Sequence, residues 1–128
     1  MAKGHRSQIK KERNEIKDPR PQAHLKYIRI SDTKARIVLD QIKGKDVATA
    51  IGILTYSPRY ASAVINKLLK SAIANAENNL GISADNLYVE EVFANQGPTM
   101  KRIRPKARGM AFRIKKRSSH LSIILNER

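Results

Sequence analysis

The chain contains no cysteine and no tryptophan, and its only aromatic residues are two Phe and four Tyr. Without cysteine it has no disulfide bond, thiolate catalyst or cysteine-ligated metal, as is typical of a reducing compartment. So few aromatic side chains argue against a surface that reads single strands by stacking bases. No apolar run approaches the ~18 residues of a membrane span, and neither a secretory signal nor a transit peptide is evident. We therefore expect a cytoplasmic protein with no membrane partner.

Acidic residues are also scarce. The chain has 26 Lys and Arg against 11 Asp and Glu, which gives a net charge of +15. No acid occurs between Glu91 and Glu127. Like charges at this density repel one another, and an anionic polymer relieves the repulsion. The composition therefore predicts nucleic acid as the partner. The basic stretch, residues 97–117, carries nine cations: Lys101, Arg102, Arg104, Lys106, Arg108, Arg113, Lys115, Lys116 and Arg117.

The basic stretch is expected to be extended. Pro105 lacks an N–H and has a fixed φ, which disfavours a helix here. Alternate residues of a strand face the same side. One face is therefore expected to carry Arg102, Arg104, Lys106 and Arg108. After Gly109 the same alternation recurs in Arg113, Lys115 and Arg117.

Three strands are expected, at residues 23–30, 87–94 and 118–126, from their β-branched and aromatic content. The simplest link between the last two is a long hairpin at about residues 95–117, with arms continuous with both strands. An arm of roughly 15 residues is about 50 Å long, whereas a ~100-residue domain has a radius of gyration of about 13 Å. The hairpin must therefore project beyond the body. A lone two-stranded ribbon is only marginally stable in water. The projecting hairpin therefore implies a large partner that stabilises it.

Three helices are expected between the first two strands. The first follows Ser31 as its N-cap and ends at Gly44, and the second is capped by Asp46. The third opens at Ser57-Pro58 and is the longest. Its apolar residues form a face over about five turns, which is typical of a core element.

The chain divides into residues 1–22 and residues 23–128. The first part is basic, closes on Pro19 and Pro21, and lacks apolar surface to offset its ordering entropy. We interpret it as a tail or short frayed helix that follows a phosphate backbone. The second part is interpreted as one RNA-binding domain.

No group of residues indicates catalysis. His5, His24 and His120 are far apart in sequence, helix caps and turns account for the carboxylates, and no glycine-rich phosphate loop occurs. We predict that the chain is not an enzyme and has no cofactor and no metal site. The cations favour backbone and shape contacts with structured RNA. The alternative is a nucleoid-type architectural protein that wraps duplex DNA.

Three segments carry a resemblance to a known family. They are KLLKSAIANAENN from Lys67, GPTMKRIRPKARG from Gly97 and KKRSSH from Lys115. With ISDTKARIVLDQIKGK from Ile30, they closely resemble the bacterial large-subunit ribosomal protein L22 family over about residues 24–128. The resemblance implies an α+β fold. In that fold a three-stranded antiparallel sheet packs against three helices in β-α-α-α-β-β order, with a long protruding basic β-hairpin.

The resemblance also implies a role. Proteins of that family are structural constituents of the large ribosomal subunit that bind its rRNA and support early assembly. Their hairpin tip contributes to the wall of the peptide exit tunnel. The implied partners are large-subunit rRNA, neighbouring ribosomal proteins and, transiently, the nascent peptide, with no homo-oligomer.

Candidate residues combine the basic stretch, three cations on the polar face of the first helix, and one histidine. The candidate rRNA-binding residues are Lys34, Arg36, Lys43, Lys101, Arg102, Arg104, Lys106, Arg108, Arg113, Lys115, Lys116, Arg117 and His120. The tunnel-lining residues that the resemblance implies are Arg102, Arg104, Pro105, Lys106, Ala107, Arg108, Gly109 and Met110. Met110 and Phe112 depart from the basic or small polar residues that the family often has there.

Overall fold

A computed structural model describes residues 5–15 and 18–128. The sheet strands and helices, in chain order, are α1 (His5–Glu15), β1 (Gln22–Ile28), α2 (Asp32–Ile42), α3 (Val47–Tyr56), α4 (Tyr60–Asn75), β2 (Leu87–Gln96), β3 (Met100–Pro105), β4 (Ala111–Lys116) and β5 (Ser119–Glu127). A π-helical turn, η1 (Ala76–Leu80), and a 3₁₀ turn, η2 (Ala84–Asn86), lie between α4 and β2.

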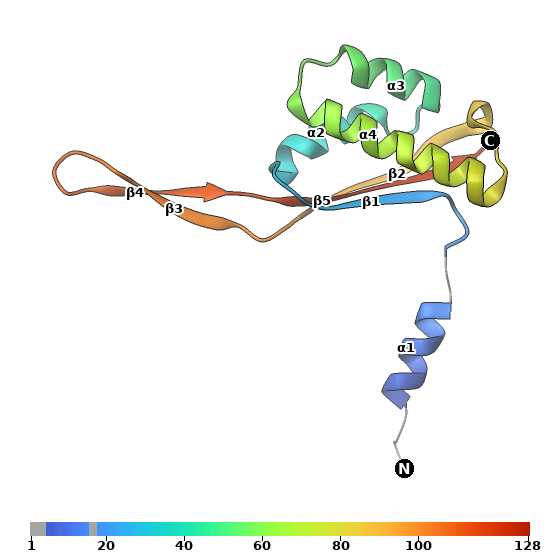
Figure 1. The fold of residues 1–128 in the computed structure, drawn as a ribbon, viewed down its shortest axis with the longest axis horizontal. Coiled ribbons are helices and arrows are strands. Elements are labelled where there is room, and N and C mark those ends of the chain that lie inside the picture. The colour runs from blue at the N-terminus through green and yellow to red at the C-terminus, as the bar shows by residue number, and fades with distance from the viewer. Residues whose placement is uncertain (1–4, 16–17) are drawn as a thin grey trace.

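The body is a three-stranded sheet in the order β1-β5-β2, with both outer strands antiparallel to β5. Helices α2, α3 and α4 lie on one face of this sheet (Figure 1). Alternate residues of β5, Leu121, Ile123 and Leu125, are almost fully buried against them. The α+β class, the antiparallel sheet and the three covering helices are therefore confirmed.

Helix α1 lies away from this body (Figure 1). Its residues from Ser7 to Glu15 are all exposed. The extension expected at residues 1–22 thus contains a helix of 11 residues, and an isolated helix of this length is marginal in water.

The helix boundaries follow local signals. Ser31 and Asp46 occupy the N-cap positions of α2 and α3 as expected, but neither side chain makes a capping hydrogen bond. Lys43 is the C-cap of α2, and Gly44 follows it with φ of 74°. The expected start of the third helix at Ser57-Pro58 is wrong by two residues. The Ser57 N–H donates to Ile53 O and closes α3, so α4 begins only at Tyr60.

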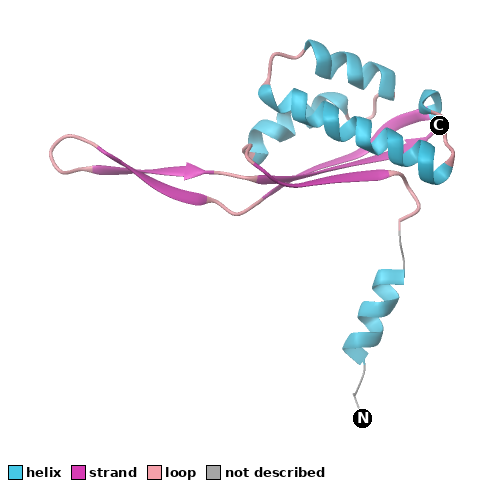
Figure 2. Cartoon of the chain, in the orientation of Figure 1, coloured by secondary structure: helices cyan, strands magenta, loops and turns pink. Residues whose placement is uncertain are grey.

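The hairpin projects well beyond the body, but its arms are not continuous with the sheet, contrary to expectation (Figure 2). Residues 97–99 and 117–118 interrupt the strands, and β3 and β4 form a separate two-stranded sheet. Pro98 has no N–H to donate to a ladder. Instead its carbonyl accepts a hydrogen bond of 2.5 Å from Ser118 Oγ, while the Gly97 N–H donates to Ser118 O at 2.8 Å.

This joint requires glycine at position 97. A Cβ there would lie 2.8 Å from Ser118 Oγ and 3.2 Å from the Ser118 carbonyl carbon and oxygen. Because these atoms hold the two arms together, we define the joint as Gly97, Pro98 and Ser118.

We expect Gly97→Ala to destabilise the body by about 1–3 kcal/mol, the usual cost of overpacking a tight contact. The matched control is Gly52→Ala in α3, where an added Cβ meets nothing within 4 Å and helix propensity favours alanine by about 1 kcal/mol. Urea unfolding measures both. Equal effects of the two substitutions would contradict the role of the joint.

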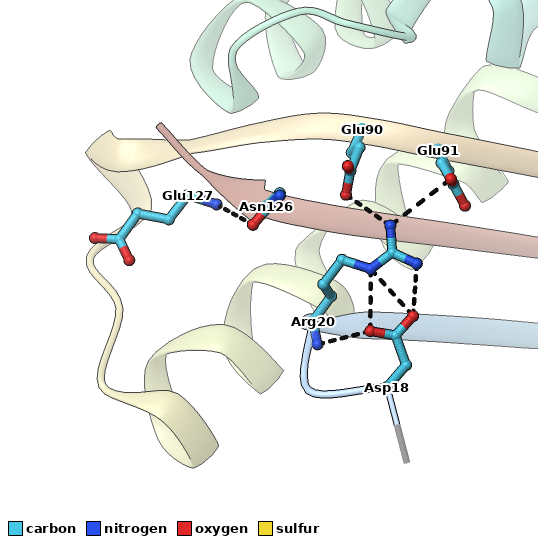
Figure 3. A network of polar contacts seen from close by, with 6 residues as sticks. All are labelled: Asp18, Arg20, Glu90, Glu91, Asn126 and Glu127. Atoms are coloured by element: carbon cyan, nitrogen blue, oxygen red, sulfur yellow. Dashed lines mark hydrogen bonds and ion pairs between the residues drawn. The ribbon is translucent and has the colours of Figure 1, made fainter. Parts of the chain in front are cut away.

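The start of β1 is tied to β2 by Arg20 (Figure 3). Its guanidinium binds Asp18 in a two-pronged contact, with Nη2 at 2.6 Å from Oδ2 and Nε at 3.0 Å from Oδ1. Its Nη1 donates to Glu90 Oε2 at 2.8 Å, and Glu91 Oε1 lies 3.7 Å away. These side chains fix where the N-terminal extension leaves the body. Hydrogen bonds from the Arg20 side chain, and then from its backbone N–H, lower the pKa of the Asp18 carboxyl below its ordinary value of 3.8.

The contact between Asp18 and Arg20 is expected to make the free energy of unfolding depend on pH. Because the folded pKa lies below the unfolded one, the stabilising contribution is complete above about pH 4 and is lost as pH falls through the folded value. Wild type should therefore exceed Asp18→Asn in unfolding free energy at pH 6, by a small amount for an exposed pair. The two proteins should converge in strong acid. Chemical denaturation across this range tests it, and a difference that persists after full protonation would refute it.

Candidate nucleic-acid interface

The hairpin exposes almost all of its side chains. Every residue from 100 to 117 is exposed except Ile114, which is half-buried. The strands pair from Met100 with Lys116 to Pro105 with Ala111. No residue of β3 or β4 belongs to the hydrophobic core, so these strands depend on their own ladder for order.

Both hairpin faces mix cations with apolar groups. Directly opposed residues share a face. One face carries Met100, Arg102, Arg104, Phe112, Ile114 and Lys116, and the other carries Lys101, Ile103, Pro105, Ala111, Arg113 and Lys115. The alternation predicted for Arg102 and Arg104 is thus confirmed. Exposed apolar side chains among cations are typical of a surface that a partner covers.

The predicted alternation does not continue through the tip. Lys106 and Arg108 lie in a loop, residues 106–110, that the Lys106 N–H closes by donating to Met110 O at 2.7 Å. Arg108 and Gly109 have φ of 60° and 70°, the left-handed values that type I′ turns need. For Arg108 this conformation costs roughly 1–2 kcal/mol.

An open cleft of about 930 Å³ lies at the base of the hairpin. It has one wall from the body and one from the hairpin, and no Asp or Glu lines it among the described residues. Seven cations line it: Arg29, Lys34, Arg59, Arg102, Lys115, Lys116 and Arg117. This cationic cleft is the place where body and hairpin contribute charge to the same surface.

The cationic cleft brings together predicted residues and residues that the sequence reading missed. Lys34 from α2 joins the predicted hairpin cations. Arg29, Arg59 and Tyr60 were missed because Arg29 directly follows β1, whereas Arg59 and Tyr60 lie at the start of α4, far away in sequence. The sequence offered no signal for them, because Arg29 fell within the first expected strand and Arg59 within the third expected helix.

Three predicted residues have other surroundings. The Arg36 Nη2 donates to Ala94 O at 3.1 Å and lies 3.7 Å from Asp32, so this side chain already links α2 to β2. Lys43 is the C-cap of α2, at the opposite end from Lys34, and does not line the cationic cleft. His120 lies within the sheet on β5.

His120 supports a strained backbone position. The pairing of β1 with β5 shifts between Leu25 and Ile28, and Tyr27 there has φ of 57°. The Tyr27 N–H donates to His120 Nδ1 at 3.0 Å, and the two rings meet edge to face at 4.7 Å. Such a ring contact contributes about 0.5–1.5 kcal/mol, which offsets much of the strain. The contacts of His120 are therefore structural.

Comparison with known proteins supplies the family. Residues 23–126 match the family model described as Ribosomal protein L22p/L17e. This chain belongs to that family. It is 64% identical to the "Large ribosomal subunit protein uL22" of Lachnoclostridium phytofermentans and 61% identical to that of Lachnospira eligens, over the full length of both chains in each case. The same-named protein of Acetivibrio thermocellus is 59% identical over 83% of this chain and 85% of its own.

Membership of the L22p/L17e family confirms two predictions. The family resemblance read from the sequence was correct, and a chain of this ribosomal protein family is not an enzyme. Over the described residues, none of the helices is both long and apolar enough to cross a membrane.

The tip turn gives a pair of substitutions with opposite expected effects. Gly109→Ala forces a second side chain into the left-handed region and should loosen the turn, whereas Arg108→Gly should relieve about 1 kcal/mol of strain. Hydrogen exchange at the Lys106 amide should accelerate in the first variant and slow in the second. Unfolding of the body should change in neither, because no residue of the hairpin belongs to the hydrophobic core and the ribbon opens locally. Changes of the same sign would contradict this account.

Proposed function

We propose that this chain is a structural component of the large ribosomal subunit in the cytoplasm, where it binds large-subunit rRNA through the hairpin and the cationic cleft. The observation that carries the proposal is the hairpin itself. It has exposed cations, exposed apolar side chains and no core residue. A ribbon of this composition gains order and charge neutralisation together when RNA surrounds it.

The tip is proposed to line the peptide exit tunnel and to contact the nascent peptide transiently. The support is the projection of the tip away from the body (Figure 1) and the relatives' name, which is that of a large-subunit protein. Phe112 shares a hairpin face with Arg104. Lys106 Nζ lies 5.9 Å from the centroid of the Phe112 ring. Met110 is exposed at the closing end of the loop, so the tip offers apolar as well as charged contacts.

Support of early subunit assembly belongs to the same proposal. A hairpin that becomes ordered as RNA closes around it must enter before the surrounding RNA is compact. The basic extension, residues 1–22, is proposed to follow a phosphate backbone, and neighbouring ribosomal proteins are proposed as further contacts. Over the described part of the extension, the side chains of Lys10, Lys11 and Arg13 are exposed on α1.

Competition binding distinguishes the proposed function from the alternative, an architectural protein that wraps duplex DNA. Large-subunit rRNA fragments should displace duplex DNA of equal length from the protein. Salt dependence alone does not discriminate, because both complexes release counterions. Tighter binding to the DNA would refute the proposed function.

Replacing Arg102, Arg104 and Arg108 together by Ser is expected to weaken rRNA binding without unfolding the body. All three side chains are exposed, so the melting temperature should change little. The slope of log affinity against log salt should fall by roughly 0.7–0.9 for each phosphate that the variant no longer neutralises. Filter binding across a salt series measures the slope. A large drop in melting temperature, or an unchanged slope, would be inconsistent with the proposal.

A further inference from the structure

Two guanidinium groups that line the cationic cleft contact the same weak acceptor, the thioether of Met100, and Arg102 Nη1 also donates to Lys101 O at 2.9 Å. Arg29 Nη2 lies 3.7 Å from Met100 Sδ, and Arg102 Nη2 lies 3.5 Å from the same sulfur. Among the described residues neither forms an ion pair with a carboxylate. A thioether is a weak acceptor, whereas a guanidinium binds phosphate through strong paired hydrogen bonds. A phosphate oxygen would therefore readily replace the sulfur.

The charge of the cationic cleft exceeds what one strand of nucleic acid neutralises. A volume of about 930 Å³ corresponds to roughly 10 Å across, and a strand advances roughly 3.4 Å per phosphate along a helix axis. One strand thus brings about three phosphates into the cleft, against seven cations. The excess matches a place where the backbone folds back on itself, because phosphates crowded there need added positive charge.

One wall of the cationic cleft belongs to the body and the other to the hairpin, and few other contacts connect the two. Arg29 and Arg59 stand on the body, while Arg102 and Lys115 stand on the hairpin. The hairpin joins the body through two short chain segments, residues 97–99 and 117–118, which are held to each other by the hydrogen bonds of the joint. An anion between the walls attracts both and would hold the hairpin at one angle.

We propose that the cationic cleft binds a sharply folded segment of RNA backbone, and that this contact fixes the direction of the hairpin relative to the body. The inference rests on the RNA-binding function proposed above and adds the shape of the RNA and the residues that read it.

Binding is tested with three RNA probes of equal length: a fully paired duplex, the same duplex with a bulge that folds its backbone sharply, and a single strand. The cleft variant is Arg29→Gln with Arg59→Gln. The matched control is Lys67→Gln with Lys70→Gln, which removes the same charge from exposed positions on α4. Thermal unfolding verifies that both variants fold.

Wild type should prefer the bulged RNA. The cleft variant should lose about tenfold or more affinity for it beyond its loss for the duplex, since each charge-assisted contact contributes about that factor. The control should weaken all probes alike. Equal losses by the cleft variant on all three probes would overturn the inference. Tight RNA binding without preference for the bulge would also overturn it and leave the proposed function standing. Tighter binding to duplex DNA than to rRNA fragments, in the competition assay described above, would refute both.

The direction of the hairpin is tested in the cysteine-free chain by spin labels on Ala107→Cys and Ser71→Cys. Both sites are exposed, one at the tip and one on α4. The distance distribution between the labels should narrow when the bulged RNA binds wild type and stay broad in the cleft variant. A width that does not change on saturation with this RNA would reject the proposed clamping of the hairpin.

Discussion

Repulsion between cations that have no acid within reach is the constraint on which this structure depends. The chain places no Asp or Glu between Glu91 and Glu127. The ion pairs of the described residues all lie outside the hairpin, where Arg20, Arg36 and Arg128 meet carboxylates. Charge is thus neutralised where the chain must pack by itself and left uncompensated where it must meet something else. The division between body and hairpin is electrostatic as well as geometric.

The sequence predicted the elements well because each is specified locally. The apolar spacing in α4 and the alternation in β5 are properties of neighbouring residues, and burial of Leu69 and Ile123 follows from them. The break at Gly97-Pro98 was missed because the residues on both sides of it are extended. Only the approach of Ser118, twenty residues further along, shows why the ladder stops there.

The site was less accessible to sequence reasoning. A charge run identifies the hairpin cations, but the cationic cleft is made by segments that tertiary structure brings together. Arg29 and Arg59 stand in ordinary local sequence, and nothing near them indicates a partner on β3 or β4. Arg36 shows a second limit of the sequence pattern. It has the charge and the exposed position of an RNA contact, yet its guanidinium bonds to a backbone carbonyl of β2. The sequence gives the charge of a side chain, but not the group to which that side chain binds in the folded protein.

The place of β5 has a consequence for the order in which the molecule can form. It is the middle strand of the sheet and follows every other element along the chain. Neither β1 nor β2 has another strand to pair with in that sheet, and the helices have no complete surface to cover until β5 arrives. During synthesis the hairpin therefore emerges from the ribosome before the three-stranded sheet that supports it has formed. Folding of the body must wait until β5 has emerged, so the newborn polypeptide is exposed to polyanions before it is structured.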